Sequence, residues 1–196
     1  MRKKIGLLLI ICGLLIILKP LAEHGYNYYC QLLLKHELKQ EDVSAVKKQN
    51  NTSEKLIRPP FLLEIPSISV EAVVVEGVGK KELRQGPGCD PRGVYPGMQG
   101  NLIIAAHNNV YGSGFKDLHK LKPGDMVFIS DKKNSKNKLA YHVESIYTIH
   151  ESDETTIFDP TEERLLTLIT CAPPSGSGKR VIVTGRQVSW TTEPNH

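Results

Sequence analysis

The sequence predicts a mainly β fold, a sandwich or barrel formed by one domain, behind an N-terminal membrane helix. Three observations support this prediction. The 196 residues leave room for one ordinary domain plus appendages. Short runs rich in Val, Ile and Thr alternate with turn residues in the second part of the chain, and one long apolar run lies near its start. The composition, 40% apolar and 23% charged, excludes wholesale disorder.

Residues 1–22 are predicted to form a cytoplasmic tip and a membrane signal-anchor. A basic cluster at 2–4 precedes an unbroken apolar run over 5–18. That run alone is marginal against the roughly 20 residues that a membrane-crossing helix needs, and the length over 5–22 is adequate if the Lys19 side chain reaches the membrane interface. A cleaved signal peptide is the rival interpretation, but residues 23–24 are a poor cleavage site. The basic cluster favours a cytoplasmic N-terminus, so we expect a single-pass protein with its remainder outside the cell.

Residues 23–58 are predicted to be a membrane-proximal stalk, either a helix on the membrane surface or a loose linker. Pro59 and Pro60 cannot continue a helix, so residues 59–196 are taken as the folded domain. Residues 1–58 carry ten Lys and Arg against five Asp and Glu, whereas the domain carries fifteen against sixteen. The net charge of +4 therefore belongs to the N-terminal part, and we expect no binding to nucleic acid.

Seven or eight strands are expected in the domain, because short runs rich in β-branched residues each end at turn residues. In chain order the runs are 61–68, 70–77, 101–107, 126–130, 138–150, 165–171 and 180–190. Glycine and proline pairs, or lysine and asparagine, fill most of the gaps between them. Three segments have helical character, each a turn or two long: 80–83, 115–121 and 160–164.

Three residues at strand ends are candidates for chemistry. Cys171 ends the apolar run 165–171, and Arg180 begins the next strand nine residues later, so a tight hairpin would bring the two level. His107 ends the run 101–107, and its near-neutral pKa suits proton transfer. A cysteine or histidine alone is more often structural, but thiol, imidazole and guanidinium together can perform acyl transfer.

The sequences around these residues resemble the signatures of sortases, the cysteine transpeptidases of Gram-positive cell walls. TLITC (167–171) with Arg180 downstream and NLIIAAHN (101–108) upstream carry the resemblance, which covers essentially 61–190. It implies an eight-stranded sortase-type β-barrel on the plasma membrane, with His107 and Cys171 at the edge of one groove together with Arg180.

The resemblance also implies a reaction. Cys171 would attack the Thr–Gly bond of an LPxTG-like sorting signal, and the thioacyl-enzyme would pass the protein to an amine acceptor, a peptidoglycan cross-bridge or a pilin lysine. His107 would act as acid and then base, while Arg180 would hydrogen-bond the substrate backbone or oxyanion. Thr170 and Ala172 would lie near the substrate carbonyl.

Ile169 is expected to touch the proline of the signal, although it could equally be a core residue. Cys89 lies in GPGCDP, where many sortases carry a histidine, so it either approaches the groove or is a free thiol in a loop. The acidic cluster that binds calcium in some sortases is not convincingly present, with Glu64 and the acidic pair at 153–154 as its loosely placed members. We therefore expect no metal and no cofactor.

Three alternatives stay open at this point. A pilus-assembly or specialised sortase would use a pilin lysine, but no apolar segment follows residue 190, which favours wall anchoring. A non-catalytic envelope protein could bind sorting signals on the same barrel, although a binding module needs no thiol. A general cysteine protease would release its acyl-enzyme to water rather than to an amine.

Overall fold

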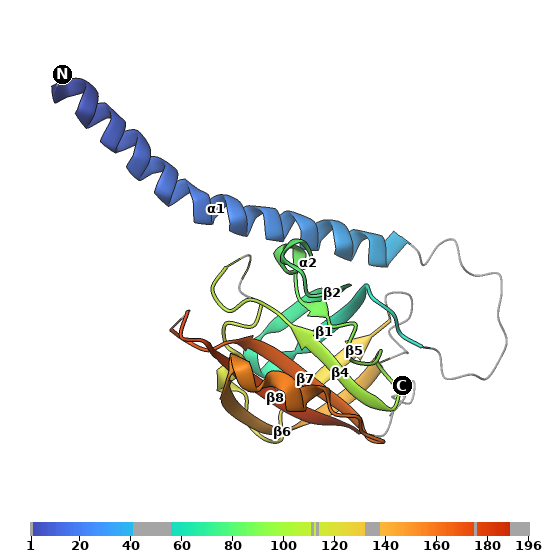
Figure 1. Cartoon of the computed structure of the whole chain (residues 1–196). Helices are drawn as coiled ribbons and strands as arrows, with labels where there is room; N and C mark the ends of the chain where they lie inside the picture. The colour runs from blue at the N-terminus through green and yellow to red at the C-terminus, as the bar shows by residue number, and fades with distance from the viewer. Residues whose placement is uncertain are drawn as a thin grey trace.

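The computed structural model of the chain describes residues 2–40, 56–110, 112, 114–131, 138–174 and 176–188. Within these ranges eight strands close into a barrel in the order β1-β2-β3-β4-β7-β8-β6-β5 (Figure 1). The strands are β1 (Phe61–Ile65), β2 (Val70–Glu76), β3 (Gly88–Cys89), β4 (Gly100–Ala105), β5 (Met126–Ser130), β6 (Lys138–His150), β7 (Arg164–Cys171) and β8 (Lys179–Val188). The eight-stranded barrel that the resemblance implies is confirmed.

Alternate residues along the strands fill the barrel, because successive side chains of a strand point to opposite faces. The buried residues of β1 are Phe61, Leu63 and Ile65, and they belong to the main core cluster. Even-numbered residues of β4 and β7 join them, namely Leu102, Ile104, Leu166 and Leu168. The odd-numbered residues of β4 and β7 therefore face out of the barrel.

A second cluster covers that outer face. Ile103, Ile169 and Ile182 contribute from β4, β7 and β8. The 3-10 helix η3 (Glu151–Phe158), which connects β6 to β7, packs Ile157 and Phe158 onto them. The outer face of β4, β7 and β8 thus carries an apolar cluster under η3, and the candidate residues lie where these strands begin or end.

The short elements differ in part from the predictions. The expected helix at 80–83 is α2 (Lys80–Gln85), and the expected helix at 115–121 contains the 3-10 turn η2 (Leu118–Lys120). The end of the run 61–68 is a 3-10 turn, η1 (Pro66–Ile68).

The prediction of a helix at 160–164 is wrong. The Glu163 N–H donates to the Thr161 hydroxyl at 3.1 Å, which makes a side-chain turn in place of a helical bond. Helical turns lie just before it, in η3, where none was expected.

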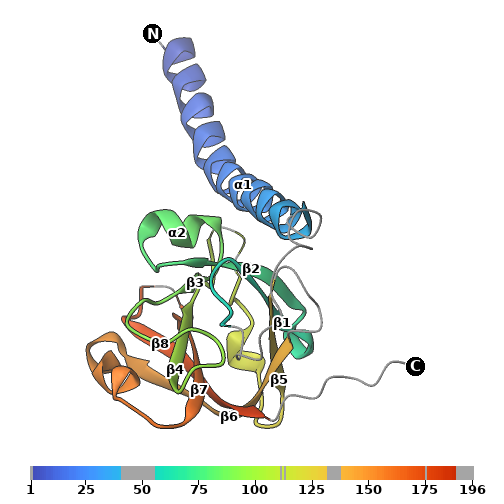
Figure 2. The same cartoon turned by 90° about the vertical axis from the view of Figure 1, so that its right-hand side faces the viewer.

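The helix α1 (Arg2–Gln40) runs without interruption through the predicted anchor and into the predicted stalk, with Pro20 inside it. Figures 1 and 2 show its second half lying along β2 and α2, while its first half extends away from the barrel. Within the described residues, no helix has an apolar stretch of the length and hydropathy that crossing a membrane requires. Stalk residues 41–55, and residues 189–190 of the last predicted strand, lie outside the described ranges.

A polar stripe in the predicted stalk holds the second half of α1 on the barrel. The stripe consists of residues spaced three or four apart, which share one helix face: His24, Asn27, Gln31 and Lys35. All four side chains form hydrogen bonds to the barrel or α2. His24 accepts from the Gly112 N–H, and Asn27 donates to the Arg84 carbonyl. Gln31 bonds to the Val73 backbone, and Lys35 donates to the Glu71 carboxylate.

Candidate active site

A hairpin brings Cys171 and Arg180 together, as the nine-residue spacing predicted. The last residue of β7, Cys171, pairs with Arg180 of β8 across the antiparallel ladder. The Ala172 N–H donates to the Lys179 carbonyl at 2.9 Å and so closes the hairpin. Directly paired residues project from the same face of a sheet. The Arg180 Nη1 accordingly lies 3.5 Å from the Cys171 sulfur.

The parallel pairing of β4 and β7 places His107 beside this pair. Ala105 lies level with Ile169 in the ladder, so His107 and Cys171 follow two residues later at the same end of both strands. Ala106 and Ala172 belong to the core inside the barrel. Since side chains alternate, His107 and Cys171 both project from the outer face. The structure therefore brings the three predicted residues to one edge, in the order His107, Cys171, Arg180.

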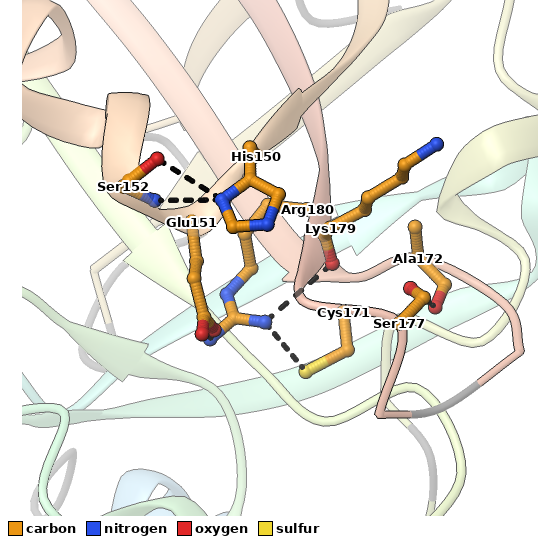
Figure 3. A network of polar contacts seen from close by, with 8 residues as sticks. All are labelled: His150, Glu151, Ser152, Cys171, Ala172, Ser177, Lys179 and Arg180. Atoms are coloured by element: carbon orange, nitrogen blue, oxygen red, sulfur yellow. Dashed lines mark hydrogen bonds and ion pairs between the residues drawn. The ribbon is translucent and has the colours of Figure 1, made fainter.

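The Arg180 guanidinium lies between the Cys171 sulfur and the Glu151 carboxylate, and its Nη1 is also 3.5 Å from the Lys179 carbonyl oxygen (Figure 3). Its Nη1 faces the Cys171 sulfur, and its Nη2 donates to Glu151 Oε2 at 2.9 Å. Glu151 is the first residue of η3, and its backbone N–H donates to the Gly178 carbonyl of the β7–β8 loop at 2.8 Å. The sequence analysis missed Glu151, because its partner lies 29 residues away and no local pattern marks it.

Partial burial sets the electrostatics of the histidine. His107 is half-buried, and this burial lowers the pKa of its imidazole below the ordinary 6.5, since the charged form loses hydration. Its carbonyl accepts the Phe115 N–H at 3.1 Å, which anchors the turn that follows β4. A lowered pKa favours the neutral imidazole at pH 7, the form that can accept a proton.

Two hydrogen bonds tie the end of β4 to the end of β7. The Asn108 side-chain amide donates to the Cys171 carbonyl at 2.6 Å. The buried Thr170 hydroxyl donates to the Ala106 carbonyl at 2.8 Å. These bonds fix the residues on either side of His107 to the residues at the thiol. Asn108 entered the sequence analysis only as a neighbour of the histidine.

The three residues expected to bind substrate all have structural contacts. The Thr170 hydroxyl and the Ala172 N–H are bonded as described, and both residues are buried. Ile169 is 8% exposed and packs in the outer cluster under η3. Their contact with a substrate stays a prediction.

Cys89 lies outside the cluster of reactive residues. It pairs with Ile104 in β3, within the barrel core, and it is a free thiol in a strand, not a loop. Burial, with Asp90 and Glu76 nearby, raises the pKa of Cys89 to about 12, so the thiol stays protonated and unreactive. In the described ranges no three His, Cys, Asp or Glu residues are grouped as ligands of a metal ion.

Comparison with known proteins decides the family. The family model of the sortase domain matches residues 63–188, more than half of the chain. The chain belongs to the sortase family. Sortases are cysteine transpeptidases, and this chain is a member of that enzyme class.

Several sortases are similar along much of their length. Sortase A of Listeria monocytogenes is 27% identical, over 94% of this chain and 90% of the relative. Sortase D of Bacillus subtilis is 28% identical, over 65% of this chain and 63% of the relative. The solved structure of the Listeria sortase A has a TM-score of 0.59 at 27% identity, over 66% of this chain and 87% of that one. A Clostridium perfringens sortase D5 transpeptidase shares the fold, with a TM-score of 0.63 at 22% identity, over 84% and 99%.

Proposed function

We propose that this sortase cleaves an LPxTG-like sorting signal between Thr and Gly and transfers the new carboxyl end to a primary amine of the cell wall. The observation that carries the proposal is the row of His107, Cys171 and Arg180 at one edge of the barrel, with guanidinium and sulfur 3.5 Å apart. Cys171 is only partly buried at its strand end, so the thiol is accessible, and the paired strands fix its direction. A protein that only binds peptides needs none of these three groups.

The reaction has two steps. His107 takes the proton of the Cys171 thiol as the sulfur attacks the threonine carbonyl, and it gives that proton to the leaving amine as the C–N bond to glycine breaks. An incoming amine then attacks the thioester, His107 removes its proton, and the thiolate leaves. Arg180 donates to the oxyanion that forms in both steps, where a fixed donor stabilises developing charge. Thr170, Ile169 and Ala172 form the wall beside this carbonyl.

The same proposal includes a membrane anchor at residues 1–22, a juxtamembrane segment at 23–58 and a catalytic domain at 59–196. The apolar side chains described between Ile5 and Leu21 are about half to three quarters exposed, on all faces of α1. A helix that is apolar all round requires an apolar environment. Extraction of cell membranes at alkaline pH tests the anchor: the chain should stay with the lipid, and release into the supernatant would contradict it.

The transpeptidase reaction is tested by product analysis. The full chain in detergent is incubated with a panel of LPxTG-like peptides, with and without triglycine or a lysine peptide, and the products are identified by mass spectrometry. We expect a ligated product that the Cys171→Ala variant does not form. Hydrolysis alone at every amine concentration would contradict transpeptidation and favour a protease.

A further inference from the structure

A cavity of about 580 Å³ lies between α1 and the barrel and reaches the candidate active site. His107 and Ala106 line one end of it, Ala72 lines the β2 wall, and Gln31 and Leu32 line the α1 wall. The cavity lies on the β2 side of His107. Arg180 and η3 lie on the other side, because β4 is followed by β7 and then β8 in the barrel.

Among the four side chains that hold the α1 wall of this cavity, Gln31 makes contacts with both β2 and α2. The Gln31 amide donates to the Val73 carbonyl at 3.1 Å and to the Gln85 carbonyl at 2.8 Å, and its oxygen accepts the Val73 N–H at 2.8 Å. The side chain therefore satisfies backbone groups of β2 and of α2 at once. Lys35 adds an ion pair with Glu71, at 2.7 Å. Together with the bonds of His24 and Asn27, these contacts fix the α1 wall against the barrel and α2.

A molecule in the cavity would approach Cys171 from the side of His107, opposite to the side on which Arg180 lies. Under the proposed function, on which this inference rests, Arg180 holds the acyl group at its side of Cys171. The second substrate must reach the thioester from elsewhere, and it must contact the base that removes its proton. His107 is that base, and the cavity opens at His107.

From this geometry we infer that the cavity between α1 and the barrel is the binding site of the amine acceptor. Its wall carries two lysines and two carboxylates: Lys35, Lys116, Glu71 and Asp117. Such a mixed wall suits a peptide with a free primary amine better than an anionic or purely apolar ligand. In the transfer the amine nitrogen forms a bond to the acyl carbon, its proton passes to His107, and the C–S bond to Cys171 breaks.

The test fills the cavity from α1 and compares two neighbouring leucines. Leu32 and Leu33 are both 48% exposed, but only Leu32 lines the cavity. Leu32→Trp and Leu33→Trp variants of the full chain are assayed with a sorting peptide and increasing triglycine, and the ligated and hydrolysed products are counted. We expect Leu32→Trp to raise the triglycine concentration for half-maximal ligation about tenfold or more, as lost acceptor binding would. Leu33→Trp should match the wild type.

A second variant approaches from the opposite wall, and acylation serves as the internal control. Ala72→Phe, on β2, should raise the acceptor requirement in the same way, while peptide consumption without triglycine reports acyl-enzyme formation. An unchanged triglycine dependence in both variants would overturn the inference, and so would an equal loss of acylation, which would assign the cavity to the sorting signal. If the wild type consumes no peptide at all, the proposed function fails and the inference fails with it.

Discussion

The Arg180 side chain contacts both the candidate nucleophile and a carboxylate of η3. Its guanidinium contacts the Cys171 sulfur on one side and the Glu151 carboxylate on the other. A planar guanidinium with a fixed fork of donors holds both contacts in one geometry, whereas the rotatable donors of a lysine ammonium would not fix it. Under the proposed function, Glu151 is therefore a positioning residue that acts on the reaction through Arg180.

The Glu151→Gln variant is predicted to lower kcat/KM by up to about fivefold, because an exposed ion pair contributes about 0.2–1 kcal/mol. Raising the salt concentration should lower the wild-type rate toward that of the variant, since screening weakens the same pair. Steady-state kinetics at two ionic strengths measure both effects. Asp153→Asn, in the same 3-10 helix, is the control. Equal effects of the two variants would contradict a specific role for Glu151.

His107 is predicted to titrate below its ordinary value. Burial lowers the pKa of His107, so an NMR titration of its ring should give a midpoint under 6.5. The unfolded chain then binds the proton first, and the free energy of unfolding should fall as the pH drops through 6.5. His107→Gln should lose that part of the pH dependence. A midpoint above 6.5 would mean instead that the thiolate holds His107 as an imidazolium.

At the scale of elements, the site depends on the register between two parallel strands and one hairpin. The hydroxyl of Thr170 bridges β7 to the Ala106 carbonyl, one residue before His107. Thr184 makes a comparable bond with Ser145, at 2.7 Å, between β8 and β6 and away from the reactive residues. The two threonines therefore form a matched pair for mutation.

Thr170→Val and Thr184→Val are each predicted to lose a hydroxyl bond while keeping a similar volume. Denaturant unfolding should show a loss of about 1 kcal/mol or more for both. Only Thr170→Val should also lower kcat, because it releases the strand end that carries His107. An equal kcat in the two variants would contradict the coupling of this bond to catalysis.

The sequence analysis located the strands that present the site, and it missed elements without a periodic pattern. β4, β7 and β8 were found from their runs of β-branched residues, and Cys171 and His107 were found at their ends. β3 has two residues, Gly88 and Cys89, which is too short for any alternation. η3 was missed because its polar residues lack a helical apolar period, and its contacts with β7 and β8 are long-range.

At the scale of the whole molecule, the least expected feature is the packing of α1 on the barrel. The stripe from His24 to Lys35 is polar, so hydropathy gave no sign that it faces the protein. Asn27 and Gln31 of the stripe bond to backbone groups of β2 and α2, which only the folded barrel brings within reach. The same helix thus contains the proposed anchor in its first half and packs on the proposed catalytic domain with its second half.

The central claim is that Cys171 forms a thioacyl bond with the sorting signal. Its most direct test is the intact mass of the full chain after rapid acid quenching of a reaction with peptide and no amine, followed by digestion to locate the adduct. We predict an increase equal to the acyl part of the peptide, on Cys171, which disappears when triglycine is added. Product formation without any adduct on Cys171, or in the Cys171→Ala variant, would contradict it.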